Sequence, residues 1–325
     1  MFMKYVPDRT NVSFMRLRLP SFLFSLAAII LSIFLIVTQG LNFGIDFRGG
    51  SVIETTKPAG VEVDDIRSSL SDLGLGQVEI TEARGTGVEA QAVFVVKIAT
   101  QDVEEGQSPE LAQQEATDLI ENTLTTDFNG LTINSRETVG PKVSGELFRS
   151  GITALAVALM LMLVYIWFRF EWQFSLGAVS ALVHDVILTI GVFAGLQLEF
   201  NLSTIAALLT IVGYSMNDTV VVFDRVREEA RKYKKMASPE LINLALNGTL
   251  SRTLLTSGTT LLALLAIFVL GGPVLRGMSF ALIWGVVVGT YSSIFVASSL
   301  LLALPQSWRR QKTAEDVPGF QAPSV

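Results

Sequence analysis

Six long apolar runs most strongly limit what this chain of 325 residues can fold into. A helix of about 20 mostly apolar residues crosses the hydrocarbon core of a bilayer, and each run has about that length. Only 17% of the residues are charged, whereas a soluble globular protein carries about 25%. The sequence therefore predicts an α-helical membrane protein with six transmembrane helices. The expected spans are 20–39, 149–168, 174–195, 201–222, 252–271 and 278–303.

Lysine and arginine gather in three of the segments that flank these runs. They lie in the N-terminal segment 1–19, in the loop 223–251 after the fourth run, and in the tail 304–325. Short loops rich in these residues stay on the cytoplasmic side of a membrane. We therefore expect both termini and the loop 223–251 to be cytoplasmic.

The segment 40–148, between the first two runs, differs from the rest of the chain in charge. Residues 41–147 contain 19 acidic and 7 basic residues, which indicates a separate domain in another compartment. Strands are expected at 50–56, 78–83, 92–99 and 131–138, and helices at 63–73 and 109–125. The resulting order, βαββαβ, predicts a periplasmic α+β domain of the ferredoxin-like kind.

Two ionisable side chains fall inside the apolar runs. Asp218 lies in the fourth run, and Arg252 opens the fifth. A charge at membrane depth costs about 2.5–3.5 kcal/mol on insertion scales, so it needs a partner or a purpose. Tyr214 lies four residues before Asp218, and Thr256 lies four residues after Arg252, so each pair shares one helix face. Together with the neighbouring Asn217, these residues form a candidate proton or charge relay.

The same residues allow three interpretations. Asp218 and Arg252 could form a salt bridge that only holds two helices together. They could instead carry protons, because burial disfavours a charged carboxylate and a nearby guanidinium favours it. A small movement of the arginine would then change whether the carboxylate holds a proton. Arg252 could also lie at the membrane interface and extend its side chain to water.

His184 and Asp185 form a second polar pair, inside the third run. A hydrogen bond between helices, or a position facing the bundle interior, would explain both residues. A secondary part in a proton network is the alternative. His184 is the only histidine, and the chain has no cysteine, so we expect no metal site and no cofactor.

A glycine-rich motif follows the first run directly. It comprises Gly44, Asp46, Arg48, Gly49 and Gly50. Glycine adopts backbone conformations that other residues resist, and Asp46 and Arg48 would point the same way in an extended chain. We interpret the motif as a junction that anchors the outer domain to its helix.

Several motifs, taken in order, resemble those of the SecD/SecF family of bacterial membrane proteins, and in particular its smaller, SecF-type members. The matching segments are 41–50 (LNFGIDFRGG), 139–144 (VGPKVS), 181–185 (ALVHD), 213–225 (GYSMNDTVVVFDR), 250–260 (LSRTLLTSGTT) and 291–295 (YSSIF). The match covers nearly the whole chain, although the outer domain matches mainly in size and element order. Met216 stands where leucine is expected, a departure without consequence.

The resemblance implies a subunit that draws on the proton-motive force and helps unfolded, exported polypeptides across the bacterial cytoplasmic (inner) membrane. It also implies kinship with the resistance-nodulation-division transporters, whose six-helix units work in pairs. This chain holds one unit, so SecD is the implied partner, with SecY, SecE, SecG and YajC as wider partners. The resemblance places the family's intramembrane charges at Asp218 and Arg252. Membrane lipid surrounds such a protein, and neither nucleic acid nor an enzymatic activity is expected.

Three other functions compete with this one. A proton-driven small-molecule exporter of the resistance-nodulation-division superfamily is the first, although such exporters usually carry two six-helix units in one chain. A passive scaffold for SecD, without proton coupling, is the second. An intramembrane aspartyl protease would need Asp185 and Asp218 as a catalytic pair. Neither residue lies in the Tyr-Asp or Gly-x-Gly-Asp sequences that such proteases show.

Overall fold

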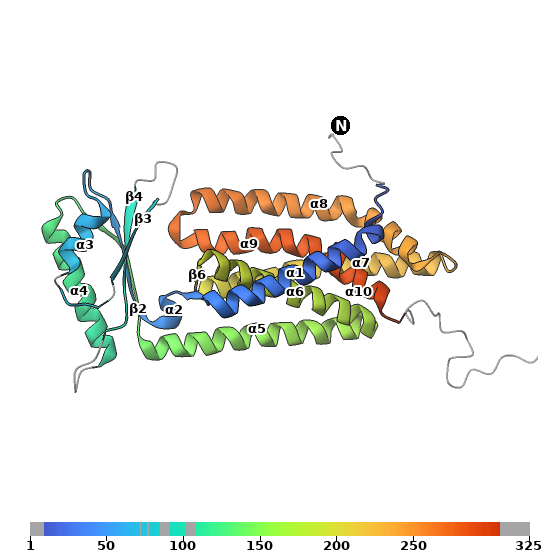
Figure 1. Cartoon of the computed structure of the whole chain (residues 1–325), viewed down its shortest axis with the longest axis horizontal. Helices are drawn as coiled ribbons and strands as arrows, with labels where there is room; N and C mark the ends of the chain where they lie inside the picture. The colour runs from blue at the N-terminus through green and yellow to red at the C-terminus, as the bar shows by residue number, and fades with distance from the viewer. Residues whose placement is uncertain (1–9, 72, 77, 85–91, 102–107, 306–325) are drawn as a thin grey trace, which may run out of the picture.

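The protein is elongated, with a sheet at one end and a bundle of long helices along the rest of its length (Figure 1). The computed structural model describes residues 10–71, 73–76, 78–84, 92–101 and 108–305. Six helical segments within these residues are long and apolar enough to cross a membrane. The prediction of six candidate membrane-spanning helices and one small sheet domain is therefore confirmed.

The long helices follow the order of the apolar runs. They are α1 (Arg18–Gln39), preceded by the 3₁₀ helix η1 (Phe14–Leu17), then α5 (Pro141–Arg169), α6 (Trp172–Leu196), α7 (Leu202–Lys232), α8 (Ser238–Leu270) and α9 (Gly272–Ser292). The last one continues through the π-helical turn η2 (Ser293–Ala297) into α10 (Ser298–Ala303). A capping box of Asn201 and Thr204 fixes the start of α7.

Most of the connection 223–251, expected between the fourth and fifth membrane spans, is helical. α7 continues to Lys232 and α8 begins at Ser238, so only a short turn separates the two helices. Ser238, Pro239 and Glu240, a sequence typical of a helix start, form the beginning of α8 itself. Leu241, in the first part of α8, is fully buried, because it packs in one apolar cluster with Met15 of η1.

α6, α7 and α9 form the centre of the bundle, and α1, α5 and α8 form its periphery. The apolar windows of the central helices are 61%, 50% and 50% buried, whereas those of the peripheral helices are each 11% buried. Small residues bring α9 close to α7: a side chain added at Gly285 would meet Ile211, and one added at Gly289 would meet Ser215. This close approach lets polar side chains of the two helices meet.

The sheet domain has the predicted order of strands and helices. Its elements are β2 (Gly50–Thr56), α3 (Val63–Ser71), β3 (Val78–Arg84), β4 (Ala92–Ile98), α4 (Pro109–Asp127) and β5 (Ile133–Val139). The strands lie in the order β3-β4-β2-β5, and every neighbouring pair is antiparallel. On the central strand β2, Ile53 lies opposite Val96 of β4 and Arg136 of β5.

Alternation along the strands gives the sheet two different faces. Ile53 and Phe94 point toward α3 and α4 and are fully buried with Ile120. The other face turns toward the helical bundle (Figure 1) and carries the polar side chains Glu54 and Lys97. A charged sheet surface therefore lies opposite the ends of the helices.

A two-stranded parallel sheet joins the domain to the bundle. Its strands are β1 (Asn42–Phe43) and β6 (Glu199–Phe200), the second of which lies between α6 and α7. After β1, the single helical turn α2 (Ile45–Arg48) leads into β2. Before it enters the larger sheet, the chain is thus tied to the ends of α6 and α7 that lie next to the sheet domain.

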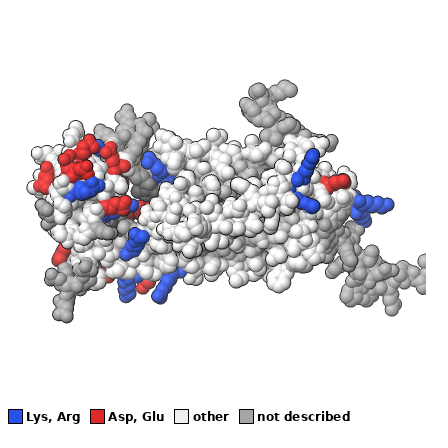
Figure 2. Space-filling view, in the orientation of Figure 1, with Lys and Arg blue, Asp and Glu red and all other residues white. Residues whose placement is uncertain are grey.

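Charged side chains are distributed unevenly along the molecule. On the face shown in Figure 2, acidic side chains gather over the sheet domain, and basic side chains lie near both ends of the bundle. The middle of this face shows no charged side chain. Such an uncharged band is what contact with the hydrocarbon core of a bilayer requires.

Candidate functional site

Asp218 lies on α7 and contacts α8. Its Oδ1 accepts a hydrogen bond of 2.6 Å from Thr253 Oγ1 of α8. Its Oδ2 is buried and has no hydrogen-bond partner among the described residues, although the hydroxyl of Ser293 also lies near the carboxylate. An ionised oxygen without a donor is costly in such a place, so Oδ2 is the atom on which a proton would lower the cost of burial.

Arg252 and Asp218 both lie in the described part of the chain, and the expected salt bridge between them is not formed. The arginine lies on the exposed side of α8, and its charge acts on the carboxylate from a distance. The next residue, Thr253, is 2% exposed and takes the position facing α7. Successive residues of a helix differ in direction by about 100°, so only one of these two side chains can face Asp218.

The other predicted relay residues differ in their contacts. Tyr214 donates a hydrogen bond of 3.2 Å from its hydroxyl to Ser257 Oγ of α8, and Ser257 lies 2.7 Å from Thr290 Oγ1 of α9. Asn217 and Thr256 are exposed, and the Thr256 hydroxyl donates to backbone carbonyls of its own helix. Tyr214 therefore belongs to a chain of hydrogen bonds between helices, whereas Asn217 and Thr256 lie outside it.

Asp185 of α6 is more completely bonded than Asp218. Its Oδ1 lies 2.9 Å from His184 Nδ1. Its Oδ2 accepts hydrogen bonds from Ser215 of α7 at 2.6 Å and from Ser292 of α9 at 2.8 Å. Asp185 is 1% exposed and His184 is 2% exposed. This carboxylate therefore joins the three central helices, and each of its oxygens has a hydrogen-bond partner.

Hydroxyl groups lie between the two carboxylates. Thr219, the residue after Asp218, pairs with Ser293 at 2.9 Å. Ser293 follows Ser292, which donates to Asp185. Because a hydroxyl group both donates and accepts hydrogen bonds, this band connects the surroundings of the two carboxylates.

Sequence reasoning missed the hydroxyl residues that complete the site, which are Thr253, Ser215, Thr219, Ser292 and Ser293. Part of the signal was present, since Ser215 and Thr219 are four residues apart on α7 and therefore share a helix face. The contact of Ser292 with Asp185 depends on how α9 packs on α6 and α7. No spacing within a single helix encodes that packing.

Two positions of the junction motif require glycine. Gly49 and Gly50 have φ angles of 76° and 125°, which residues with a side chain rarely adopt. A side chain at Gly50 would also meet the carbonyl oxygen of Ile98, and one at Gly44 would meet Glu199. The motif therefore forms a compact connection in which backbone segments approach closely.

The charged residues of the motif would point the same way in an extended chain, but the chain is not extended here. They lie on the helical turn α2, where residues two positions apart differ in direction by about 200°. Asp46 Oδ2 accepts a hydrogen bond of 2.7 Å from the backbone N–H of Leu202, at the start of α7. Arg48 lines a separate hollow of about 340 Å³. Asp46 thus ties the junction to α7, and Arg48 has no part in that contact.

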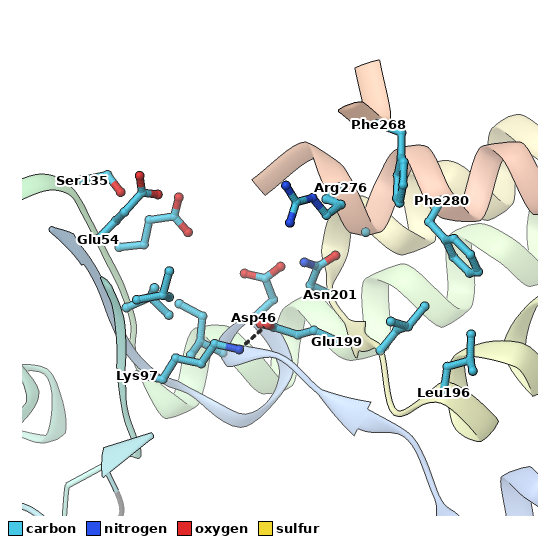
Figure 3. A pocket seen from close by; sticks show the side chains of 16 residues that line it. Asp46, Glu54, Lys97, Ser135, Leu196, Glu199, Asn201, Phe268, Arg276 and Phe280 are labelled. Atoms are coloured by element: carbon cyan, nitrogen blue, oxygen red, sulfur yellow. Dashed lines mark hydrogen bonds and ion pairs between the residues drawn. The ribbon is translucent and has the colours of Figure 1, made fainter. Parts of the chain in front are cut away.

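A cleft of about 500 Å³ separates the four-stranded sheet from the nearest ends of the helices (Figure 3). Glu54 and Ser135 line it from the sheet, and Arg276 lines it from α9. Lys97 of β4 forms an ion pair with Glu199 of β6 in this cleft. The sheet domain is therefore held to the bundle by a charge contact as well as by the covalent junction.

Among the described residues, few ionisable side chains lie at the centre of the bundle. Within the part of the chain that the structure describes, no three His, Asp or Glu side chains are grouped so as to hold a metal ion. The ionisable pairings at its centre involve Asp218, Asp185 and His184. Of the two carboxylates, Asp218 alone has an oxygen without a hydrogen-bond donor, which makes it the candidate proton site.

The sequence matches two family profiles. Residues 119–307 match the family described as "Protein export membrane protein SecD/SecF, C-terminal", and residues 34–56 match the SecD/SecF GG motif. A protein translocase subunit SecF from Cereibacter sphaeroides is 49% identical over 303 residues, which cover 93% of this chain and 92% of that protein. A SecDF subunit from Brucella abortus is 39% identical, with 92% of this chain matching 38% of that one.

Solved structures of SecDF have the same fold. The crystal structure of SecDF from Thermus thermophilus, a translocon-associated membrane protein, is 37% identical and has a TM-score of 0.77. The match covers 93% of this chain and 39% of the SecDF chain. A SecDF structure in the super-membrane-facing form has the same identity and coverage and a TM-score of 0.65.

Proposed function

Because the chain belongs to the SecD/SecF family of protein-export membrane proteins, we propose that it uses the proton-motive force, together with SecD, to drive or complete protein translocation across the cytoplasmic membrane. Its place in Sec protein export follows from SecF and SecDF relatives that match more than nine-tenths of its length. The coupling to protons is the step proposed here. The proposed coupling rests on the carboxylate of Asp218, in which one oxygen accepts a hydrogen bond and the other is buried without a donor.

Asp218 has the properties of a group that changes its charge. Thr253 stabilises one carboxylate oxygen, and the other oxygen is buried without a donor. A proton on that oxygen removes the cost of a buried charge, and the loss of that proton restores it. The two oxygens therefore have opposite effects: the hydrogen bond from Thr253 stabilises the ionised carboxylate, and the burial of the other oxygen disfavours it.

Arg252 would convert the charge of Asp218 into a movement of the helix. When the carboxylate is ionised it attracts the guanidinium, and when it is protonated this attraction is lost. Arg252 lies on the exposed side of α8, one residue from the hydrogen bond that joins α8 to Asp218. A shift of α8 against α7 is the step that we propose links proton passage to a change in the bundle. Tyr214, bonded to Ser257 of α8, would follow the same shift.

His184 and Asp185 have a secondary role in this proposal. Both oxygens of Asp185 have hydrogen-bond partners, so the pair serves first to hold α6, α7 and α9 in register. The pair of Thr219 and Ser293 then transmits the charge state of Asp218 to this network. Asn217 and Thr256 are exposed, and we assign them no part in the relay.

The six helices would cross the bacterial inner membrane with both termini in the cytoplasm. The support is the basic residues of the N-terminal segment and the tail. The acidic sheet domain would then lie on the periplasmic side, joined through the motif from Gly44 to Gly50. Its strand order, with β2 and β4 at the centre, supports a ferredoxin-like domain.

SecD is the proposed direct partner. In the SecDF relative from Brucella abortus, a region like this chain forms 38% of a longer protein, which supports association with a SecD part. SecY, SecE, SecG and YajC are wider proposed partners, and the cargo would be unfolded exported polypeptide. A protein of this kind moves its substrate and does not transform it chemically.

The deciding experiment is export of a secretory protein into inverted membrane vesicles, with and without an imposed proton gradient. We expect Asp218→Asn to lower the gradient-dependent part of export at least about tenfold, a loss of about 1.4 kcal/mol of coupling. The variant should still assemble with SecD, since asparagine keeps the shape and the acceptor oxygen for Thr253. Export is compared at matched abundance of the complex.

Asp224→Asn is the matched control, because Asp224 lies on the same helix and is exposed beside Arg169 at 3.2 Å. This variant should export normally. If gradient-dependent export survives Asp218→Asn as well, the chain is a passive scaffold and SecD carries the coupling. Efflux of a dye from vesicles that contain no other Sec component would instead favour a small-molecule exporter.

A further inference from the structure

The surface of the bundle beside α1 contains a hollow that the proton site does not use. Its volume is about 510 Å³. Its apolar walls come from α1, η2 and α10 and comprise Phe22, Leu26, Ile29, Phe295, Val296 and Leu300. α1 is a peripheral helix with 11% of its apolar window buried, so the hollow lies where a bilayer would surround the protein.

One end of this hollow carries a positive charge. Arg18, the first residue of α1, lines it together with the apolar side chains. α1 begins at the end of the bundle that lies away from the sheet domain (Figure 1). From Arg18 to Ile29, the helix rises about 16 Å. The hollow is therefore a long apolar groove with a guanidinium at the end where a membrane meets water.

We propose that this hollow binds an acidic phospholipid, with its phosphate group at Arg18 and one acyl chain along the apolar walls. Guanidinium groups bind phosphate through two parallel hydrogen bonds. Basic pockets between membrane helices bind anionic headgroups for the same reason. The charge at one end and the hydrocarbon surface along the rest match the two parts of such a lipid.

The lining of the hollow favours a phospholipid as its occupant, because a guanidinium lies at one end and hydrocarbon side chains form most of the remaining wall. The apolar part of this wall would face the hydrocarbon of the bilayer, where burial against an acyl chain removes apolar surface from water.

A second hollow on another face of α1 provides an internal comparison. It has a volume of about 410 Å³ and is lined by Phe24, Ala28 and Leu31 of α1 and by Trp284 of α9, among others. None of its lining residues is charged. We expect this hollow to accept the acyl chain of any phospholipid, whereas the hollow at Arg18 prefers acidic lipids.

The bound lipid would touch the polar network of the central helices. His184 lines the same hollow as Arg18, and its Nδ1 lies 2.9 Å from Asp185 Oδ1. An acyl chain at this place keeps water away from the network. The inference rests on the proposed membrane crossing and not on proton coupling, so either proposal can fail without the other.

The test places a fluorescent reporter in each hollow of the complex with SecD, reconstituted in phosphatidylcholine vesicles. Phe22→Trp reports on the charged hollow, and Phe24→Trp reports on the uncharged one. Brominated phosphatidylglycerol or brominated phosphatidylcholine is added to quench the reporter, and the signal of the complex without a reporter is subtracted. At Phe22→Trp, brominated phosphatidylglycerol should quench the reporter at a mole fraction about fivefold lower than brominated phosphatidylcholine does. One basic residue near a membrane typically provides a preference of that size.

Arg18→Gln should remove this preference, and Arg16→Gln should keep it, because Arg16 is exposed nearby and does not line the hollow. At Phe24→Trp, the two lipids should quench equally. Equal quenching by both lipids at Phe22→Trp with Arg18 present would overturn the proposal. So would a reporter that neither lipid quenches, since protein would then cover the hollow.

Discussion

Asp185 and Asp218 both lie within long apolar helices, yet their surroundings differ. Asp185 has a histidine nitrogen on one oxygen and two serine hydroxyls on the other. Asp218 has a threonine hydroxyl on one oxygen, and its other oxygen is buried without a donor. Asp185 contacts three central helices, whereas the hydrogen bond of Asp218 crosses to the peripheral helix α8.

In our proposal, the number of hydrogen-bond partners separates a structural carboxylate, Asp185, from one that changes its charge, Asp218. A buried carboxylate is stable only when hydrogen bonds replace those it made with water. Asp185 has hydrogen-bond partners on both oxygens and lies among the three central helices. Asp218 meets this condition on one oxygen, next to a helix whose apolar window is only 11% buried. Burial alone would point to Asp185 as the functional carboxylate, whereas the proposal assigns that role to Asp218.

Asp185→Ala should have the largest effect, and it should act on stability. The change leaves His184, Ser215 and Ser292 without their common partner, and each buried polar group left without a partner costs about 1–3 kcal/mol. Asp218→Ala should cost only about 1 kcal/mol, because a single hydrogen bond is lost. Thermal unfolding of the purified complex measures both variants.

Asp185→Asn provides the control for size, because asparagine keeps one acceptor oxygen for the serines. It should recover more than half of the stability that Asp185→Ala loses. If Asp185→Ala and Asp218→Ala destabilise the complex equally, the distinction between a structural and a switching carboxylate is wrong. That result would show that the donors counted around Asp185 do not hold the central helices together.

Arg252→Met should have the next largest effect, and it should act on export. The variant removes the charge that we propose follows Asp218, and gradient-dependent export should fall about tenfold, or about 1.4 kcal/mol of coupling. Stability should change little, since Arg252 is exposed and forms no ion pair with Asp218. Export into inverted vesicles measures the effect at matched abundance.

Two further variants sharpen this result. Arg252→Lys keeps the charge and should retain part of the coupling. Arg276→Met removes an arginine that lines the cleft near the sheet domain, at the other end of the bundle, and should leave the coupling intact. Normal export in Arg252→Met would mean that this residue only lies at the membrane interface, which was one of the interpretations that the sequence allowed.

The sequence predicted the elements of this fold well because their signals are local. Apolar runs defined the six helices, and alternation defined the strands that Ile53 and Phe94 help to pack. The extension of α7 and α8 through residues 223–251 was missed, because charge pattern and not helix continuity guided that assignment. Leu241 is buried there by contact with Met15, more than 200 positions earlier in the chain.

The site was predicted only in part because its contacts depend on helix rotation. The sequence identified Asp218 and Tyr214, and the structure places both in hydrogen bonds with α8. It favoured Arg252 as the partner of Asp218, whereas Thr253 holds that position. A rotation of α8 by one residue would exchange the two, and only packing against α7 and α9 fixes that rotation.

Thr253→Val should have the smallest effect and is the most specific test of the comparison. Valine keeps the shape of threonine but removes the one hydroxyl that donates to Asp218 Oδ1 at 2.6 Å. Loss of one such bond, worth about 0.5–1 kcal/mol, should lower gradient-dependent export about twofold to fivefold.

Thr253→Ser restores the donor and should restore export. Thr256→Val is the matched control, because that hydroxyl donates only to its own helix. Equal behaviour of the two valine variants would mean that Asp218 works without its donor, and that donor number does not determine which carboxylate changes its charge.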